Sequence, residues 1–267
     1  MKTVLLARDG LVARYLAHEL VSAGLVDAIV TEVGSQARQR KLQREASRTP
    51  WWRMPAFVFD LAALAVYGSL WSRVLQRRLA GHAAAAGYPE GVERHAVEDA
   101  NDAECIEVLR TLEPDVLLVL GTSILKADVL SIPTRAALNV HGGIVPEYRN
   151  VHSEVWAVLN DDTSRIGTSI LHLDEGIDSG AVALQETVQL THIGTADVSF
   201  FELRWRNVEL AARLARGALE REREGSLPKT PQPTDRISGF YRTPGLGEFI
   251  RLAYRSRRLP ASSSSRS

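Results

Sequence analysis

The first part of the chain alternates between apolar runs and helical periodicity. Residues 3–7 form a short apolar run of the kind found in buried parallel strands. Val12, Leu16 and Leu20 then recur at helical spacing, and residues 25–33 read as a second strand. This β–α–β order predicts a doubly wound α/β sheet. The first turn contains no G-x-G-x-x-G, so the predicted sheet does not imply a dinucleotide.

The same alternation continues along the chain. We expect further strands at residues 92–97, 115–120, 168–173 and 181–188. We expect helices at residues 102–112, 153–160 and 195–219. Beyond residue 219 the sequence is rich in Pro, Arg and Ser, which predicts a short extension with a disordered serine-rich end at 261–267.

The segment from about residue 35 to residue 80 departs from this pattern. Residues 35–49 are polar and basic, and we interpret them as a solvated helix or loop rather than a phosphate clamp. Residues 51–79 mix aromatic residues with Ala, Leu and Val, although Pro55 and Asp60 interrupt their longest apolar run, which is shorter than the roughly 20 residues of a transmembrane helix. We expect a helical insertion that packs on the core or forms a homodimer through residues 51–79, in preference to touching a membrane surface.

The amino-acid composition excludes several classes of binding site and targeting segment. Lys plus Arg and Asp plus Glu each number 32, so the formal net charge is zero and no overall charge attracts nucleic acid or acidic membranes. Cys105 is the only cysteine, which excludes an internal disulfide and a cysteine-based zinc cluster, and we predict no metal site. The N-terminal apolar run is too short for a signal peptide, so we expect a cytoplasmic protein without a transmembrane segment.

The candidate chemistry lies between residues 137 and 185. Asn139 and His141 alternate with apolar residues, so their side chains should project from one face at the end of a strand. Amide and imidazolium groups can stabilise an oxyanion, and a carboxylate such as Asp178 can accept a proton and set the charge of the histidine. Taken singly, each residue could also be a turn cap or a surface side chain, and His152 and His172 are alternative bases.

The segments NVHGGIVPEYRNVHSEVWAVLN and GTSILHLDEGIDSGAVALQ resemble the core signature of the folate-dependent formyltransferases, which include glycinamide ribonucleotide, methionyl-tRNA and sugar N-formyltransferases. Nine positions follow the family pattern in order: Asn139, His141, Pro146, Tyr148, Arg149, Trp156, Asp178, Gly180 and Gln185. The resemblance implies a Rossmann-like formyltransferase fold with a mostly parallel sheet. It also implies a catalytic domain over residues 1–219, with residues 220–267 as an extension.

The resemblance also implies roles for individual residues. Asn139, His141 and Asp178 fall on the catalytic positions, and the implied co-substrate is 10-formyltetrahydrofolate. The positions expected to contact its pterin are Leu120, Gly121, Ile124, Leu125, Glu175, Gly176 and Ile177. Those expected on the acceptor side are Gly143, Tyr148 and Arg149. Gly143 and Asn150 depart from the usual Ser and Gly of the family, which leaves the acceptor more open than the chemistry.

We expect the acceptor to be a small amine, such as an amino sugar nucleotide or a biosynthetic amine. Only some 48 residues follow Leu219, whereas methionyl-tRNA enzymes of this family carry an added basic domain of about a hundred residues. Three alternatives stay open: a methionyl-tRNA formyltransferase-like enzyme, a formyltetrahydrofolate hydrolase, and a folate-binding protein without turnover.

Overall fold

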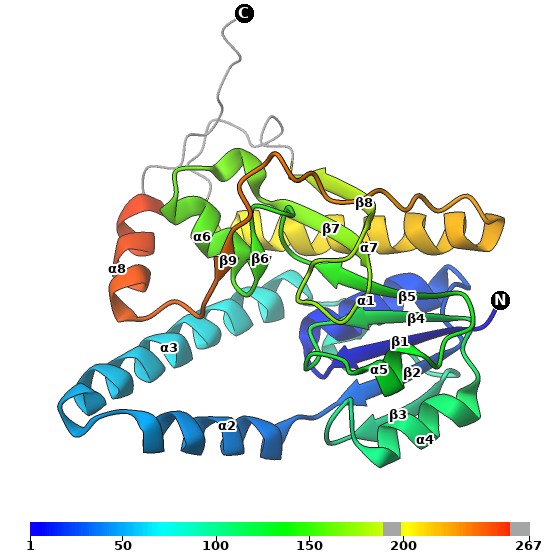
Figure 1. Ribbon diagram of the computed structural model, residues 1–267, viewed down its shortest axis with the longest axis horizontal. Coiled ribbons are helices and arrows are strands. Elements are labelled where there is room, and N and C mark those ends of the chain that lie inside the picture. The colour runs from blue at the N-terminus through cyan, green and yellow to red at the C-terminus, as the bar shows by residue number, and fades with distance from the viewer. Residues whose placement is uncertain (189–198, 257–267) are drawn as a thin grey trace, which may run out of the picture.

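A seven-stranded sheet forms the centre of the molecule (Figure 1). The computed structural model describes residues 1–188 and 199–256. Its strand order is β3-β2-β1-β4-β5-β7-β8. The strands are β1 (Thr3–Arg8), β2 (Ala28–Glu32), β3 (Glu93–Val97), β4 (Val116–Leu120), β5 (Ala136–His141), β7 (Gly167–His172) and β8 (Val182–Thr187). The predicted mostly parallel α/β sheet is confirmed.

The direction of the strands changes next to β5. Strands β1 to β5 are parallel to their neighbours, whereas β7 pairs antiparallel to β5 and β8 antiparallel to β7. In the register of β5 with β7, Asn139 lies opposite Leu171 and His141 opposite Ser169. The carboxyl end of β5 therefore lies beside the start of β7.

Helices cover both faces of the sheet because alternate strand residues point to opposite sides. Leu5 and Leu118 pack on the side covered by α1 (Leu11–Ser22) and the long helix α7 (Phe200–Glu224). The other face, with Val4 and Leu6, is covered by α4 (Ala103–Leu112) and α5 (Ala127–Leu130). Cys105 is fully buried on that second face, where it packs as a small apolar residue.

The insertion forms a helical hairpin that projects sideways from the sheet (Figure 1). It consists of α2 (Ser35–Arg48), a short 3₁₀ turn at Trp51–Arg53 and α3 (Met54–Arg78). Both helices lie within residues 35–80, the segment in which we expect a helical insertion. Within α3 only Tyr67, Trp71 and Leu75 are buried, and they pack toward α1 and α7. In length and composition the stretch Trp51–Arg78 would suffice to cross a membrane, yet one of its faces is docked on the α/β body.

The chain beyond α7 returns to the site end of the sheet. It forms β9 (Phe240–Tyr241), which pairs with β6 (Arg149–Asn150), and then α8 (Leu246–Arg255), which packs on α3 and on α6 (Ser153–Leu159). Two further 3₁₀ turns lie at Ala83–Ala85 and Thr163–Arg165. Helix α7 continues five residues past the expected end at residue 219, and Gly225 ends it in the left-handed conformation typical of a helix C-cap. The expected start of this helix at 195–198 and the expected disordered end at 261–267 lie outside the described residues.

Candidate functional site

The candidate site begins with two polar side chains at the carboxyl end of β5. Leu138 and Val140 of this strand pack into the core under α1 and α7. Asn139 and His141 therefore point to the opposite side, where a pocket opens. The alternation in the sequence thus places an amide and an imidazole side by side where β5 ends.

Asp178 joins these two residues from the loop between β7 and β8. Its Oδ1 accepts a hydrogen bond from Asn139 Nδ2 at 3.0 Å, and its Oδ2 lies 3.3 Å from His141 Nδ1. Oδ2 also accepts a hydrogen bond from the backbone N–H of Asn150 at 2.8 Å. Asp178 has φ 49°, in the left-handed region where Asp is one of the few tolerated residues. The three predicted catalytic side chains are therefore in contact.

Both nitrogens of His141 face acceptors. Its Nε2 lies 2.7 Å from the Tyr148 carbonyl, which can only accept, so Nε2 carries a hydrogen. Its Nδ1 faces the Asp178 carboxylate. The imidazole is therefore held from both sides, by a backbone carbonyl and by a carboxylate. The His141 side chain is only 6% exposed, so both contacts lie in a largely dehydrated environment.

The pocket in front of these residues has a volume of about 420 Å³. One wall is the loop after β4 and the other is the loop before β8. Six of the seven residues expected to contact the pterin line it, namely Leu120, Gly121, Ile124, Leu125, Gly176 and Ile177. The seventh, Glu175, is exposed and lies outside the lining. The lining combines apolar side chains with loop backbone, which suits a flat heterocycle that needs both stacking area and hydrogen bonds.

A buried carboxylate fixes the loop after β4. Glu32, at the end of β2, is 1% exposed and accepts hydrogen bonds from Ala100 N at 3.1 Å and Ser123 N at 3.0 Å. Arg8, which also lines the pocket, pairs with it at 3.0 Å. Because a buried charge needs several donors, this network holds the ends of β1, β2 and β4 in one arrangement.

The residues expected on the acceptor side lie behind the pocket. Tyr148 is 3% exposed, and its hydroxyl donates to Asp162 at 2.9 Å while its carbonyl holds His141. Burial raises the pKa of this hydroxyl, so it stays neutral. Neither Tyr148 nor Arg149 nor Gly143 is among the pocket-lining residues. Their contacts with an acceptor stay a prediction.

Gly143 is the tightest of these positions. A Cβ there would lie 2.4 Å from the Tyr148 carbonyl oxygen and 2.6 Å from His141 Nε2. Gly142 has room, because a Cβ there would meet nothing nearer than Glu154 Oε1 at 3.6 Å. Gly143 therefore lets the backbone turn directly beneath the imidazole.

Three further charged or polar residues line the pocket mouth, namely His152, Glu154 and Arg204. Arg204 Nε lies 4.0 Å from Glu154, and its guanidinium also contacts the Tyr67 hydroxyl on α3. Burial, with the charge of Arg204 second, lowers the pKa of His152 to about 4, so its imidazole is neutral at pH 7. The sequence indicated His152 only as an alternative base. Arg204 lies within a long helical pattern, and no local signal distinguishes it.

Other expected residues have structural partners. His172 bonds the Pro228 carbonyl at 2.9 Å and does not line the pocket. Gln185 donates to the Val145 carbonyl at 3.0 Å and to Ser169 at 2.8 Å, which supports the loop below Gly143. Tyr241 stacks on Tyr148 and Trp156, which attaches the chain after α7 to the site loop.

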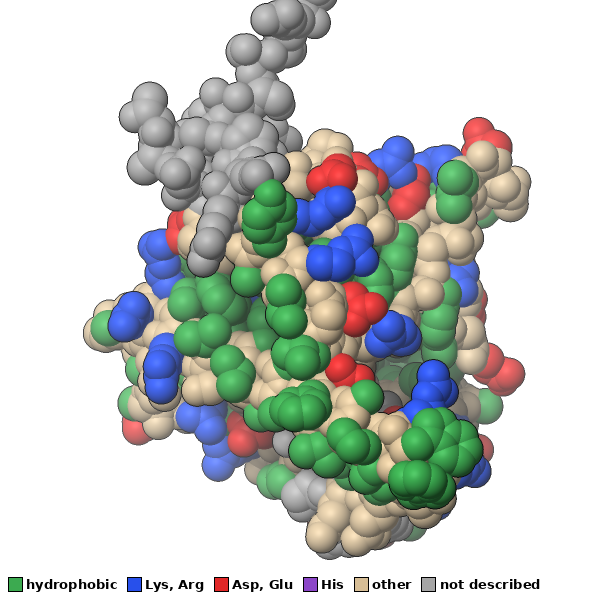
Figure 2. All heavy atoms as spheres, turned by 90° about the vertical axis from the view of Figure 1, so that its left-hand side faces the viewer, with side chains coloured by type: hydrophobic (Ala, Val, Ile, Leu, Met, Phe, Trp, Pro, Cys, Tyr) green, Lys and Arg blue, Asp and Glu red, His purple; other side chains and the backbone are tan. Residues whose placement is uncertain are grey.

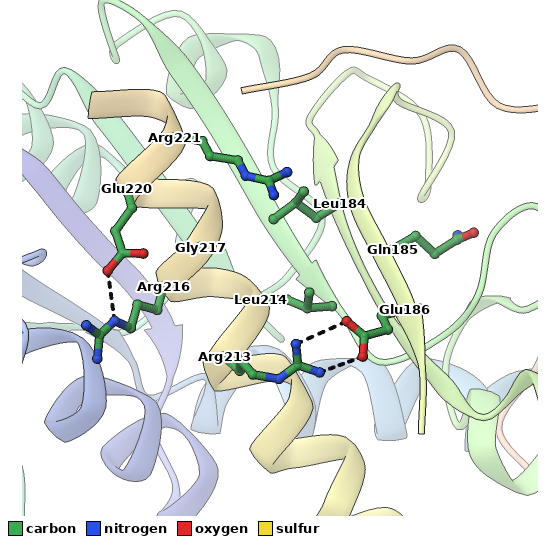
Figure 3. Close-up of a pocket in the computed structure, with 9 residues that line it drawn as sticks. All are labelled: Leu184, Gln185, Glu186, Arg213, Leu214, Arg216, Gly217, Glu220 and Arg221. Carbon is green, nitrogen blue, oxygen red and sulfur yellow. Dashed lines mark hydrogen bonds and ion pairs between the residues drawn. The ribbon is translucent and has the colours of Figure 1, made fainter. Parts of the chain in front are cut away.

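A second hollow, of about 380 Å³, lies between β8 and α7 (Figure 3). Its charges are largely neutralised among themselves, because Arg213 pairs with Glu186 and Arg216 with Glu220. Gln185 points away from it, toward its own partners. The hollow therefore offers little free polar chemistry compared with the pocket at β5.

Comparison with known proteins identifies related sequences. The formyl transferase family profile matches residues 73–213, which is more than half of the chain. A methionyl-tRNA formyltransferase from Methylacidiphilum infernorum is 36% identical over 136 residues, covering 51% of this chain and 41% of that relative. The chain thus spans less than half the length of this curated relative.

Solved structures share the fold. A sugar N-formyltransferase from Shewanella sp. has a TM-score of 0.57 at 13% identity, covering 96% of this chain and 88% of its own. The formyltransferase PseJ from Anoxybacillus kamchatkensis, in complex with a formamido sugar nucleotide and tetrahydrofolate, has a TM-score of 0.50 at 14% identity, covering 94% and 90%. At these identities the likeness concerns the fold alone.

Proposed function

Because the chain belongs to the formyl transferase family, we propose that it transfers a formyl group from 10-formyltetrahydrofolate to an amine. The contact of Asn139, His141 and Asp178 at the pocket mouth is the observation that carries this proposal. These three groups come from two segments 37 residues apart, and they meet where open α/β sheets bind ligands.

The pocket supports a folate donor. Its apolar walls at Leu120, Ile124 and Ile177 suit the faces of a pterin ring, and the loop backbone at 121 and 176 offers hydrogen-bonding groups to its edges. When bound, the co-substrate supplies an electrophilic formyl carbon. The donor site then lies between the loop after β4 and the loop before β8, with Asn139 and His141 at its inner end.

The three polar residues divide the work of acyl transfer. Asn139 Nδ2 has two hydrogens and gives one to Asp178, so the other is free to face the formyl oxygen. We propose that His141 is protonated during transfer, so that its positive charge favours the negative charge developing on that oxygen. Asp178 accepts the proton that the attacking amine loses, directly or through a water molecule. The new N–C bond forms as the bond from the formyl carbon to the folate nitrogen breaks, and that nitrogen takes up a proton.

We further propose a small amine as the acceptor. His152, Glu154 and Arg204 at the pocket mouth provide a neutral imidazole, a carboxylate and a guanidinium within a confined space. Such a set can orient a compact polar molecule and can hold its ammonium group before attack. The sugar N-formyltransferase with the same fold is consistent with this proposal.

A methionyl-tRNA acceptor is the second candidate. Two observations favour it. The relative from Methylacidiphilum infernorum is a methionyl-tRNA formyltransferase, and α2 contains a run of basic residues. An acceptor screen has to include this substrate beside the small amines.

The test is a mass-spectrometric screen for a gain of one formyl group. Purified protein is incubated with 10-formyltetrahydrofolate and a panel of amino sugar nucleotides, small biosynthetic amines and methionyl-tRNA. We expect Asp178→Asn to lower the rate at least about 100-fold, since it removes the proton acceptor while keeping a residue that tolerates positive φ. Asp161→Asn is the matched control, because Asp161 also has positive φ (56°) and does not line the pocket.

Three results would contradict the proposal or part of it. Full activity of Asp178→Asn would remove the carboxylate from the mechanism. Folate turnover without an added acceptor would identify a hydrolase, and folate binding without formyl transfer to any amine would identify a binding protein.

A further inference from the structure

The α2–α3 hairpin exposes an unusual set of large apolar side chains. Trp51 and Trp52 at its tip are 81% and 65% exposed. Nine of the fourteen exposed large hydrophobic residues in the described part of the chain lie on this hairpin or on the adjoining α8: Trp51, Trp52, Val58, Phe59, Val66, Leu70, Leu246, Ile250 and Tyr254. In Figure 2 the side of the molecule that carries the hairpin shows a broad patch of hydrophobic side chains with Lys and Arg around it.

The patch is continuous with an apolar groove between α3, α7 and α8. The groove has a volume of about 880 Å³, and Phe59, Val66, Leu70, Phe249 and Ile250 are among its lining residues. Exposed apolar surface that is contiguous over several helices usually marks a contact site in a soluble protein. The buried residues Tyr67, Trp71 and Leu75 hold the C-terminal half of α3 on the body, whereas no residue of its N-terminal half is buried.

The hairpin also concentrates positive charge. Residues 35–78 contain nine Lys and Arg but only two acidic residues, Glu45 and Asp60. The segment therefore carries a net charge of +7, while the whole chain has a net charge of zero and the remainder a net charge of −7. A basic, Trp-containing helical element with one apolar face is the composition of helices that lie in a membrane interface.

We propose that the α2–α3 hairpin and α8 bind the surface of an anionic phospholipid bilayer. The apolar side chains of α3 and α8 enter the headgroup–acyl boundary, and Trp51 and Trp52 lie at the level of the headgroups. Exposed basic residues such as Arg44 and Arg48 contact lipid phosphates. Helix α3 lies along the surface and does not cross the bilayer, because one face is held by the α/β body.

The charge and the apolar character of this surface argue against two other binding partners, a second copy of the chain and RNA. A two-fold contact with a second copy of the chain would place two segments of net charge +7 against each other. An RNA backbone would match the charge, but it would leave the aliphatic side chains of Val58, Val66 and Ile250 without a matching surface. An anionic bilayer satisfies both the charge and the apolar area.

The experiment measures sedimentation of the full-length protein with vesicles. Two lipid compositions are compared, pure phosphatidylcholine and phosphatidylcholine with 30 mol% phosphatidylglycerol, each at low and high salt. We expect binding to the anionic vesicles, at least about tenfold weaker binding to the neutral ones, and a loss of affinity at high salt.

Two variants test the two halves of the surface. Trp51→Ser with Trp52→Ser removes the aromatic tip, and Arg44→Glu with Arg48→Glu reverses exposed charge on α2. Each should lower vesicle binding about tenfold or more. The matched controls are Ile237→Ser, a residue 87% exposed elsewhere, and Arg110→Glu with Lys229→Glu, two exposed basic residues outside the hairpin.

The controls should bind vesicles as the wild type does, and all variants should keep the wild-type circular dichroism spectrum. The proposal is overturned if the wild type does not bind anionic vesicles, or if the hairpin variants bind as well as the controls. It is equally overturned if vesicle binding is absent and the tip variant instead abolishes a dimer in sedimentation equilibrium, or the charge variant abolishes tRNA binding. Because the readout is binding rather than formyl transfer, it is independent of the acceptor.

Discussion

At the residue scale, the candidate site depends on the close approach of the backbone at Gly143 and Tyr148 to the imidazole of His141. Ser153 Oγ donates to the Tyr148 carbonyl at 3.2 Å, and the same carbonyl holds His141 Nε2. Gly143 sits between these groups with no space for a side chain. The orientation of His141 is therefore set by packing around a glycine as well as by Asp178.

We predict that Gly143→Ala destabilises the protein and lowers activity. The added Cβ would lie 2.5 Å from Ser153 Oγ and 2.6 Å from His141 Nε2, so the loop or the imidazole must move. The free energy of unfolding should fall by about 1–3 kcal/mol. Gly142→Ala is the control and should change it by less than about 1 kcal/mol, because only ordinary contacts form. Urea unfolding curves give both values, and equal effects would show that the loop adapts.

His152 leads to a prediction about pH. Its pKa is lowered to about 4 in the folded protein by burial and by Arg204. As the pH falls from about 6.5 to about 4, the unfolded chain takes up a proton that the folded protein does not. The free energy of unfolding should therefore decrease across this window.

The size of this decrease is tested by substitution. His152→Gln should remove on the order of 1 kcal/mol of the fall in unfolding free energy between pH 6.5 and pH 4.5. His95→Gln, at a partly exposed histidine, serves as the control. If both variants follow the wild-type pH profile, His152 is not the buried group responsible.

At the element scale, α3 contributes apolar side chains that pack on the body and one carboxylate that contacts α8. Its inner face packs Trp71 and Leu75 against Leu79, Ala84 and Trp205. Asp60, which interrupts its apolar run, accepts a hydrogen bond from the N–H of Leu246 at 2.6 Å. A carboxylate at the N-terminus of α8 satisfies a free donor and suits the helix dipole, so Asp60 links α3 to α8.

We predict that Trp71 anchors the hairpin. Its ring stacks on Phe201 at 6.1 Å, and the Arg204 guanidinium lies 4.5 Å above it. Trp71→Ala should lower the free energy of unfolding by about 3–5 kcal/mol, as expected for a buried aromatic residue. The same substitution at the exposed Trp52 should cost less than about 1 kcal/mol. Thermal unfolding of the two variants would contradict the assignment if they lost the same stability.

At the scale of the whole molecule, the pocket joins parts that are distant in the chain. Arg8 ends β1, Leu120 ends β4, Asn139 lies on β5, Asp178 precedes β8 and Arg204 lies on α7. A ligand that contacts all of them is bound by the folded state only, and its binding energy adds to the stability of the entire domain.

We predict that a folate without a transferable formyl group raises the melting temperature. At a concentration of 100 times the Kd, tetrahydrofolate should stabilise the fold by about 2.7 kcal/mol. Asp178→Asn should keep most of this stabilisation while losing turnover, because the proposed pterin contacts are made by other residues. A melting temperature unchanged at saturating tetrahydrofolate would argue against the proposed donor site.

The family signature and the α/β alternation were readable because both depend on local sequence. Asn139 and His141 are neighbours on one strand, and the positions that carry the family resemblance lie in order between residues 139 and 185. The helices of the insertion were also predicted, since composition and periodicity determine that a segment is helical. The positions of Arg204 and Tyr67 were not predicted, because a long helix presents many polar residues and only packing selects the one that reaches the pocket.

The sequence by itself determined the order of strands and helices, the family, and the three polar residues at positions 139, 141 and 178. It could do so because strand and helix periodicity and motif spacing are properties of neighbouring residues. Only the tertiary structure decided that the outer face of α3 stays exposed, that α8 returns beside it, and that Glu32 is buried under the pocket loop. These features depend on which surfaces of distant segments pack together. The burial or exposure of a side chain is therefore fixed only when the whole chain has folded.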